Sequence, residues 1–271
     1  MVKSGMWTLM LLLYRALRVG ALLKYAPACV QEWKDREFYK EQMRIRVRTR
    51  EKLVAEEVLQ PKYQEGLLRL INRHGAAAMG DYLEFGVYHG TSLITMYRVL
   101  EEMGLDHVRL FGFDSFEGLP ATAKTDDEGH WKPGEFRSDY DFTLQVLEVE
   151  KVEMERVVLT KGFYDVTLTP ALKQRHQLLK ASVIMVDCDM YLSAKEALTF
   201  CEPLIVDEAM IAFDDWYPLA ERELGEKRAF DEFLKEHPCF EVEDFGGYPP
   251  HGKVFFVKRV KNELLQGNRM P

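Results

Sequence analysis

The stretch SVIMVDCDMYLS, at residues 182–193, decides the predicted fold of this chain. It opens with an apolar run of strand length and then turns acidic at Asp187 and Asp189. An unbroken apolar run is typical of a strand inside a parallel sheet that helices cover on both faces. Because buried carboxylates are costly unless a positive partner lies opposite, the acids at the end of this run require an explanation.

A regular alternation extends in both directions from this stretch. From residue 81 onward, short apolar runs alternate with segments whose apolar residues recur at helical spacing. Five runs are typical of parallel strands, namely DYLEFGVY, VRLFGFDS, RVVLTKG, ASVIMVD and EAMIAFDD. The last two, CFEVEDF and KVFFVKRV, flank the turn-forming GGYPPHG and predict an antiparallel pair. The pattern predicts an α/β fold of the Rossmann-like class I methyltransferase type, with a mostly parallel seven-stranded sheet that ends in an antiparallel pair.

The N-terminal part of the chain has a different character. We predict that residues 1–60 form a helical extension, which covers an acceptor site or joins two copies of the chain. Residues 61–271 are predicted to form the methyltransferase domain. The apolar run near the start is shorter than the roughly 20 residues that span a bilayer. We expect residues 6–25 to form an amphipathic helix that packs on the domain or on a second copy in a homodimer. Peripheral contact with a membrane is the less favoured alternative.

Composition narrows the class of protein further. A net charge of -8 over 271 residues argues against nucleic-acid binding. The basic stretch RIRVRTREK, at residues 44–52, is interpreted as a solvated or acid-paired surface, and the alternative is an arm that covers an anionic substrate or partner. Widely spaced cysteines predict a cytoplasmic protein with reduced, buried thiols, and these residues are Cys29, Cys188, Cys201 and Cys239.

The residues after the first two strands predict a cofactor site. In open parallel sheets, ligands bind beyond the carboxyl ends of the strands. The first strand ends in EFGVYHGTS, where Gly86 and Gly90 let a ligand approach the backbone. Thr91 and Ser92 begin the following helix and supply free N–H groups. Asp114, at the end of the second strand, is placed to accept hydrogen bonds from a ribose diol.

Glu84 favours a methyl donor over a nicotinamide cofactor. The dehydrogenase fingerprint G-x-G-x-x-G is absent, and the sequence has E-x-G-x-x-x-G instead. Glu84 would repel a pyrophosphate, whereas the amino group and sulfonium of S-adenosylmethionine are cationic. Ser115 follows Asp114, and Gly162 and Phe163 follow the third strand. Phe163 or Tyr164 is predicted to lie beside the adenine, and the alternative for such an aromatic residue is a place in the core. We therefore predict S-adenosylmethionine as the cofactor, with a dehydrogenase as the disfavoured alternative.

The acids after the fourth and fifth strands predict a metal site. The run AMIAFDDW, at residues 209–216, ends in Asp214 and Asp215, on a strand expected to neighbour the one that ends at Asp187. Clustered carboxylates without a visible basic partner favour a hard divalent cation, Mg²⁺ first, with Mn²⁺ or Ca²⁺ as alternatives. The alternative is a helix cap and an ion pair, and Asp189 is interpreted as such a cap.

Six segments together resemble the macrocin O-methyltransferase (TylF-like) family over about residues 60–260: GDYLEFGVYHGTS, FGFDSFEGLP, KGFYDVTL, VDCDMYLSAKEAL, FDDW and GEKRAFDEF. The resemblance implies S-adenosylmethionine, Mg²⁺ and methylation of sugar hydroxyls in natural products. It also implies metal ligands at Asp187, Asp214 and Asp215, and cofactor contacts at Glu84, Gly86, Gly90, Asp114 and Ser115. The chain departs from the family pattern at Phe85 and His89, and in VDEAM before the fifth strand.

These observations predict an O-methyltransferase in which Asp187 is both a metal ligand and the general base. A catechol-type or phenolic O-methyltransferase with the same metal site is the alternative. A non-catalytic interaction protein is less favoured, because it would be expected to lose the metal acids. The polar segment 122–142 predicts a lid with Trp131 and Phe136 as covers, or else a mobile surface loop.

Overall fold

The computed structural model describes residues 28–260, so the amphipathic helix predicted at residues 6–25 lies outside the described part of the chain. The chain divides into two compact units, residues 1–50 and 51–271. Helix α2 (Ala28–Arg48) belongs to the first unit, and within it Arg44 forms an ion pair with Glu41 at 3.3 Å. None of the helices in residues 28–260 is long and apolar enough to cross a membrane.

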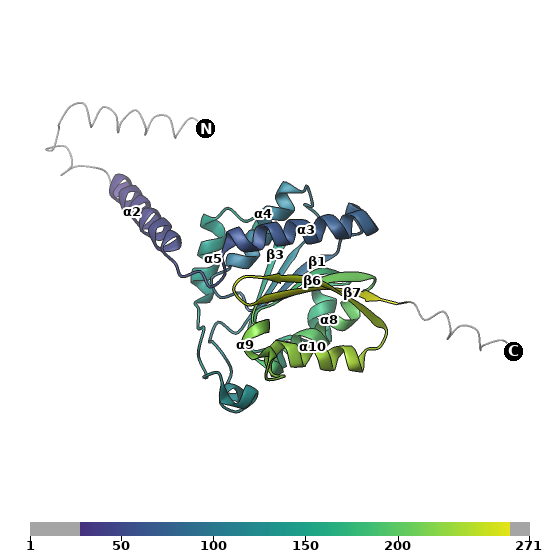
Figure 1. Cartoon of the computed structure of the whole chain (residues 1–271). Coiled ribbons are helices and arrows are strands. Elements are labelled where there is room, and N and C mark those ends of the chain that lie inside the picture. Colours follow the sequence, from purple (N-terminus) through teal and green to yellow (C-terminus); the bar gives the residue numbers. More distant parts are fainter. Residues whose placement is uncertain (1–27, 261–271) are drawn as a thin grey trace. The chain divides into compact units, whose positions relative to one another are not determined.

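The second unit is built on a seven-stranded sheet with the strand order β3-β2-β1-β4-β5-β7-β6 (Figure 1). The first five strands are parallel to one another, and β7 runs antiparallel to both β5 and β6. This arrangement confirms the predicted fold class. The strands are β1 (Asp81–Phe85), β2 (Leu110–Asp114), β3 (Val157–Lys161), β4 (Ala181–Val186), β5 (Glu208–Phe213), β6 (Phe240–Tyr248) and β7 (Gly252–Arg259).

Helices cover both faces of the sheet (Figure 1). Helices α3 and α4 pack together on one face, and α8 and α10 pack together on the other. The α-helices of this unit are α3 (Glu56–His74), α4 (Thr91–Glu102), α5 (Tyr140–Val149), α6 (Tyr164–Thr167), α7 (Pro170–His176), α8 (Tyr191–Cys201), α9 (Trp216–Ala220) and α10 (Gly225–Glu236). Short 3₁₀ helices are η2 (Ala76–Ala78), η3 (Ala121–Lys124), η4 (Asp126–Gly129), η5 (Met154–Arg156) and η6 (Glu202–Leu204).

The central strands are buried along their whole length. Every residue of β1, β4 and β5 is buried, which agrees with their largely apolar sequences. Each large apolar side chain that is fully buried contributes about 1.5–3 kcal/mol relative to an exposed one. In the register of β4 and β5, Val186 lies beside Phe213. The acids that follow the two strands therefore begin at the same level of the sheet.

Several helix starts follow local sequence signals. The Asp139 side chain accepts a hydrogen bond from the Phe142 N–H at 2.7 Å at the start of α5. Thr169 caps α7, whose first residue is Pro170, a position where proline costs no intrahelical hydrogen bond. Three described cysteines are free thiols, and the expectation of full burial was wrong for Cys239, which is half-buried. It lies in the turn between α10 and β6, directly before Phe240.

Candidate active site

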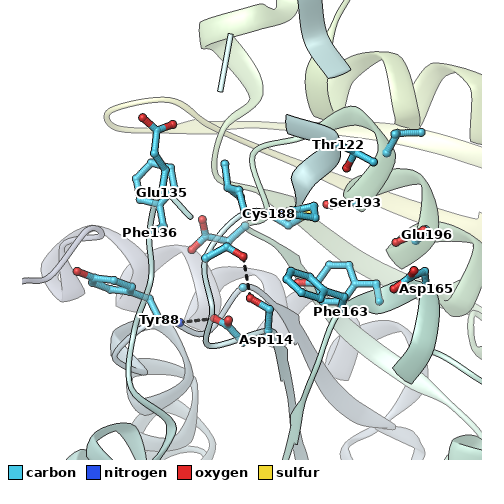
Figure 2. A pocket seen from close by; sticks show the side chains of 18 of the residues that line it. Tyr88, Asp114, Thr122, Glu135, Phe136, Phe163, Asp165, Cys188, Ser193 and Glu196 are labelled. Carbon is cyan, nitrogen blue, oxygen red and sulfur yellow. Dashed lines mark hydrogen bonds between the residues drawn. The ribbon is translucent and has the colours of Figure 1, made fainter. Parts of the chain in front are cut away.

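A cavity of about 390 Å³ opens at the carboxyl ends of the parallel strands (Figure 2). It is lined by residues that follow four different strands, as expected for a ligand site in an open α/β sheet. Five of the predicted site residues lie in its lining: Gly86, Asp114, Ser115, Phe163 and Asp187. The other predicted cofactor residues, Glu84, Gly90, Thr91, Ser92 and Gly162, are outside this lining, in the strand and turns around it.

Gly86 is required by the protein backbone as well as by any ligand. Its φ is +94°, and a Cβ at this position would lie 1.6 Å from the carbonyl oxygen of Asp187. The N–H of Asp187 donates to the carbonyl of Phe85 at 2.8 Å, which holds the two strand ends together. The sequence suggested a ligand as the reason for this glycine. The structure adds the main chain of Asp187 as the group that approaches most closely.

Asp114 organises the turn that follows β1. Its Oδ2 accepts a hydrogen bond from the N–H of Tyr88 at 2.8 Å (Figure 2). The same oxygen accepts the N–H of Val87 at 2.9 Å. Its Oδ1 accepts the N–H of Phe116 at 2.6 Å. Burial raises the pKa of Asp114, and these three backbone donors oppose that shift. Since a carboxylate has about four acceptor positions, one remains for a ribose hydroxyl.

Glu84 lies in β1, just before the turn where the cofactor is predicted to bind. Its side chain is fully buried and accepts hydrogen bonds from the hydroxyls of Tyr82 and Ser92, both at 2.6 Å. Burial raises the pKa of Glu84 to about 8, against these hydrogen bonds. Ser92 is therefore engaged with Glu84, and the pair joins β1 to the start of α4. Direct contact of either residue with the cofactor stays a prediction.

Replacing Glu84 with Gln should change how stability depends on pH. The folded state binds the Glu84 proton more tightly than the unfolded state, whose pKa is near 4.5. The contribution of Glu84 to the free energy of unfolding is therefore fully present below pH 4.5 and is lost as pH rises toward 8. Relative to wild type, Glu84→Gln should gain about 3 kcal/mol of unfolding free energy between pH 5 and pH 8. Chemical denaturation at both pH values measures this, with Glu117→Gln as an exposed-acid control. If the unfolding free energies of wild type and Glu84→Gln changed equally between the two pH values, the prediction would be contradicted.

The structure brings Asp187, Asp214 and Asp215 together into one carboxylate cluster. One oxygen from each lies within 4.8 Å of the others. Burial raises the pKa of Asp187 well above its usual range, and the neighbouring acids Asp214 and Asp215 raise it further. Burial, followed by the charge of Asp214, raises the pKa of Asp215 to about 7. Mutual repulsion of this kind disfavours three negative charges unless a cation lies between them.

The donor set of the carboxylate cluster fits a hard divalent cation. All its potential ligand atoms are carboxylate oxygens, which Mg²⁺ and Ca²⁺ prefer. Asp214 Oδ1 is buried and has no hydrogen-bond partner among the described residues. Buried polar atoms normally have a partner, so this oxygen is available to a ligand. Asp187 also lines the cavity, so the cluster and the cavity meet at this residue.

Glu226 supports the cluster and is a residue that the sequence analysis did not single out. Its fully buried carboxylate accepts the N–H groups of Cys188 at 3.3 Å and Asp215 at 3.1 Å. It thereby links the backbone after β4 to the backbone after β5. The available signal was an acid in the first turn of an amphipathic helix, which is normally read as a surface residue that favours the helix dipole.

The interpretation of Asp189 as a helix cap was wrong. Helix α8 has no capping hydrogen bond from its own N-terminal flank, and the first N–H groups are bound by Asp126 and Asp127. Asp189 has a φ of +63° and is only 9% exposed. Burial, and then the nearby charge of Asp215, raises its pKa well above the usual range. It is a further acid at the carboxylate cluster.

The aromatic residues divide between cavity and core. Phe163 lines the cavity (Figure 2). Tyr164 also reaches its wall, but packs edge-to-face on Phe85 with ring centroids 5.8 Å apart. Segment 122–142 was expected to cover the site with Trp131 and Phe136. Phe136 lines the cavity, while Trp131 packs against Phe136 with ring centroids 6.0 Å apart.

Comparison with known proteins adds a family and a fold. The family model of macrocin O-methyltransferase (TylF) matches residues 65–241. The solved structure of the O-methyltransferase NovP is 20% identical, with a TM-score of 0.60, and covers 74% of this chain and 79% of its own. The calicheamicin methyltransferase CalS11 is 19% identical, with a TM-score of 0.54 and coverage of 72% and 76%. An O-methyltransferase from Bacillus cereus in complex with SAH is 14% identical, with a TM-score of 0.52 and coverage of 90% and 96%. No match is found among curated proteins.

Proposed function

This chain belongs to the macrocin O-methyltransferase (TylF) family and is an S-adenosylmethionine-dependent O-methyltransferase, and on that premise we propose that its acceptor is a hydroxyl of a sugar or glycosylated natural product. We further propose that the reaction depends on a divalent cation, Mg²⁺, held by the carboxylate cluster. CalS11, a structural neighbour, is described as a TDP-rhamnose 3'-O-methyltransferase, which supports a sugar acceptor.

One observation carries the proposal: Asp187 belongs both to the cavity lining and to the carboxylate cluster. A cofactor in the cavity and a cation at the cluster would therefore share a border at this residue. A methyl donor and an acceptor hydroxyl must come within reacting distance of each other. The shared residue supplies that proximity, because it belongs to both sites.

The cavity residues have distinct roles toward the cofactor. Asp114 would bind the ribose diol through its remaining acceptor position, and Ser115 follows it in the same turn. Phe163 would pack beside the adenine, and Gly86 would leave room for the methionine portion near the end of β1. Gly90, with a φ of +77°, shapes the turn, and the first N–H groups of α4 at Thr91 and Ser92 follow it.

The chemistry is an in-line methyl transfer. The acceptor oxygen forms a bond to the methyl carbon, the bond from that carbon to sulfur breaks, and S-adenosylhomocysteine leaves. When bound, a divalent cation orients the acceptor hydroxyl and lowers its pKa. Asp187, Asp214 and Asp215 would hold that cation, and the hydroxyl proton passes to a carboxylate within hydrogen-bond reach.

Two carboxylates are candidates for the proton acceptor. The sequence predicts both roles, metal ligand and general base, for Asp187. Asp189 is the second candidate, because it lies buried at the cluster and does not cap α8. A carboxylate that binds a cation is a weaker base than one beside it, and this difference favours Asp189.

The alternatives to a sugar O-methyltransferase are an enzyme with a different acceptor and a protein that methylates no acceptor. A catechol-type or phenolic O-methyltransferase would use the same carboxylate cluster, and the acceptor alone distinguishes it. A non-catalytic interaction protein would not need three acids kept together in a half-buried site. Homodimer formation, a cytoplasmic location and the role of the N-terminal extension stay predictions.

Calorimetric titration tests the proposed function. S-adenosylmethionine and S-adenosylhomocysteine are titrated into metal-free protein, and the titrations are repeated with Mg²⁺ and a trial nucleotide-sugar acceptor. We expect saturable cofactor binding under all conditions, and acceptor heat only when Mg²⁺ is present. Acceptor binding that is independent of Mg²⁺ would contradict the metal site, and the absence of cofactor binding would contradict the assignment of the cavity.

A further inference from the structure

Asp127 connects the N-termini of two helices that are far apart in sequence. Its Oδ2 accepts the N–H of Tyr191, in α8, at 2.8 Å, and its Oδ1 accepts the N–H of Gly225, in α10, at 2.7 Å. The side chain is only 3% exposed. Asp126 adds a bond from its Oδ2 to the N–H of Leu192 at 2.8 Å. Both oxygens of Asp127 are therefore committed to the main chain of these helices.

The two helices adjoin the two loops that hold the candidate metal ligands. Helix α8 starts directly after the loop that holds Asp187. Helix α10 contains Glu226, which binds the N–H of Asp215 as well as that of Cys188. Asp127 thus fixes the spacing between the loop after β4 and the helix that supports the loop after β5.

The same residue belongs to a closed loop that forms part of the cavity wall. At the neck of this loop, residues 119–135, the Leu119 N–H donates to the Glu135 carbonyl and the Gly134 N–H donates to the Leu119 carbonyl, both at 2.9 Å. Residues on both sides of the neck, including Thr122 and Glu135, line the cavity. Asp127 lies in η4, within the loop, and fastens it to α8 and α10.

The backbone at this point takes an uncommon conformation. Asp127 and Glu128 have φ values of +45° and +58°, in the left-handed region. Residues other than glycine occupy this region when surrounding interactions hold them there. Asp126 and Asp127 accept three hydrogen bonds from backbone N–H groups, and Glu128 forms an ion pair with Arg222. These contacts supply the required interactions. The geometry is therefore maintained by the connection to α8 and α10.

We propose that Asp127 is a positioning residue for methyl transfer, which sets the geometry of the carboxylate cluster and joins it to the cavity wall. The inference rests on the proposed function, because it assigns the cluster to a divalent cation. Asp127 acts through the backbone N–H groups of Tyr191 and Gly225, which bind its two carboxylate oxygens. Groups that orient metal ligands in this way typically change cation affinity by about 10- to 100-fold when they are replaced.

The Asp127→Asn variant tests this role. Asparagine tolerates the left-handed conformation and preserves the size of the side chain. Its amide nitrogen cannot accept an N–H, so one of the two helix connections is lost. We expect the affinity for Mg²⁺ alone, measured by calorimetry, to fall about tenfold or more. Trypsin should also cleave after Lys124, inside the loop, faster than in wild type. S-adenosylmethionine affinity should change less than Mg²⁺ affinity.

Asp141→Asn is the matched control, because it makes the same chemical change in segment 122–142 at an exposed position. It should retain wild-type Mg²⁺ affinity and wild-type cleavage. If Asp127→Asn does not fold, Asp126→Asn, which loses either the bond to the Leu192 N–H or the bond to the Asp127 N–H, should show a smaller loss of Mg²⁺ affinity. Wild-type Mg²⁺ affinity in a folded Asp127→Asn or Asp126→Asn variant would overturn the inference. An absence of Mg²⁺ binding in wild type would overturn the proposed metal site instead.

Discussion

Replacing Asp187 with Asn should lower kcat about a thousandfold or more and leave S-adenosylmethionine affinity close to that of wild type. Asp187 lies where the cavity meets the carboxylate cluster, and Asn keeps its size while removing its charge. The proposed cation site then loses one of its three anionic ligands. The substitution leaves the proposed cofactor contacts at Asp114 and Phe163 in place, so cofactor binding and turnover should be affected separately. Steady-state kinetics and cofactor calorimetry on the same preparation measure both quantities.

A stability measurement provides an independent check on this variant. Burial and the neighbouring acids disfavour a charged Asp187 in metal-free protein. At neutral pH and without a divalent cation, Asp187→Asn should therefore melt at a higher temperature than wild type. With saturating Mg²⁺, wild type should gain stability through binding and the variant should gain much less. Wild-type turnover in Asp187→Asn would contradict the assignment, and an equal response of both proteins to Mg²⁺ would contradict its role as a ligand.

Asp189→Asn separates the two candidates for the general base. If Asp189 accepts the proton, its variant should lose kcat about a hundredfold or more while Mg²⁺ still binds. If Asp187 alone serves, Asp189→Asn should retain most of its activity. A loss of Mg²⁺ binding in Asp189→Asn would show instead that this residue is a ligand.

Gly86→Ala should destabilise the protein by about 4 kcal/mol or more and abolish measurable binding of S-adenosylmethionine. The added Cβ would overlap the Asp187 carbonyl oxygen, 1.6 Å away, and a φ of +94° adds further strain. The opposing atom is main chain and cannot move aside as a flexible side chain would. Relief requires the ends of β1 and β4 to separate, which disturbs the cavity and the carboxylate cluster together. Chemical denaturation and cofactor calorimetry measure the two effects.

Gly75→Ala is the matched control for this substitution. Gly75 has a similar φ of +85°, and a Cβ there would meet nothing within 4 Å. This variant should lose about 1–3 kcal/mol, the cost of holding alanine in this backbone conformation (φ +85°, ψ 149°) alone, and should bind the cofactor normally. Equal losses of stability in the two variants would mean that the contact with Asp187 has no energetic consequence.

The apolar runs alone were sufficient to predict the sheet. Each of the seven strands lies within a few residues of its expected position, because strand periodicity and burial on both faces are local properties of the sequence. The acids Asp187, Asp214 and Asp215 were identified for the same reason. Each directly follows a strand, and neighbouring parallel strands bring their carboxyl ends to one edge of a sheet.

The partners of the polar groups depended on contacts between distant segments. An acid shortly before a helix suggests a cap, yet Asp126 and Asp127, from another loop, bind the first N–H groups of α8 in place of Asp189. Similarly, an acid in the first turn of a helix suggests a surface residue, yet Glu226 is buried beneath the carboxylate cluster. Local sequence shows which groups can form hydrogen bonds. Only the packed chain determines which of several equivalent donors and acceptors come within bonding distance, because that choice depends on how loops from separate strands meet.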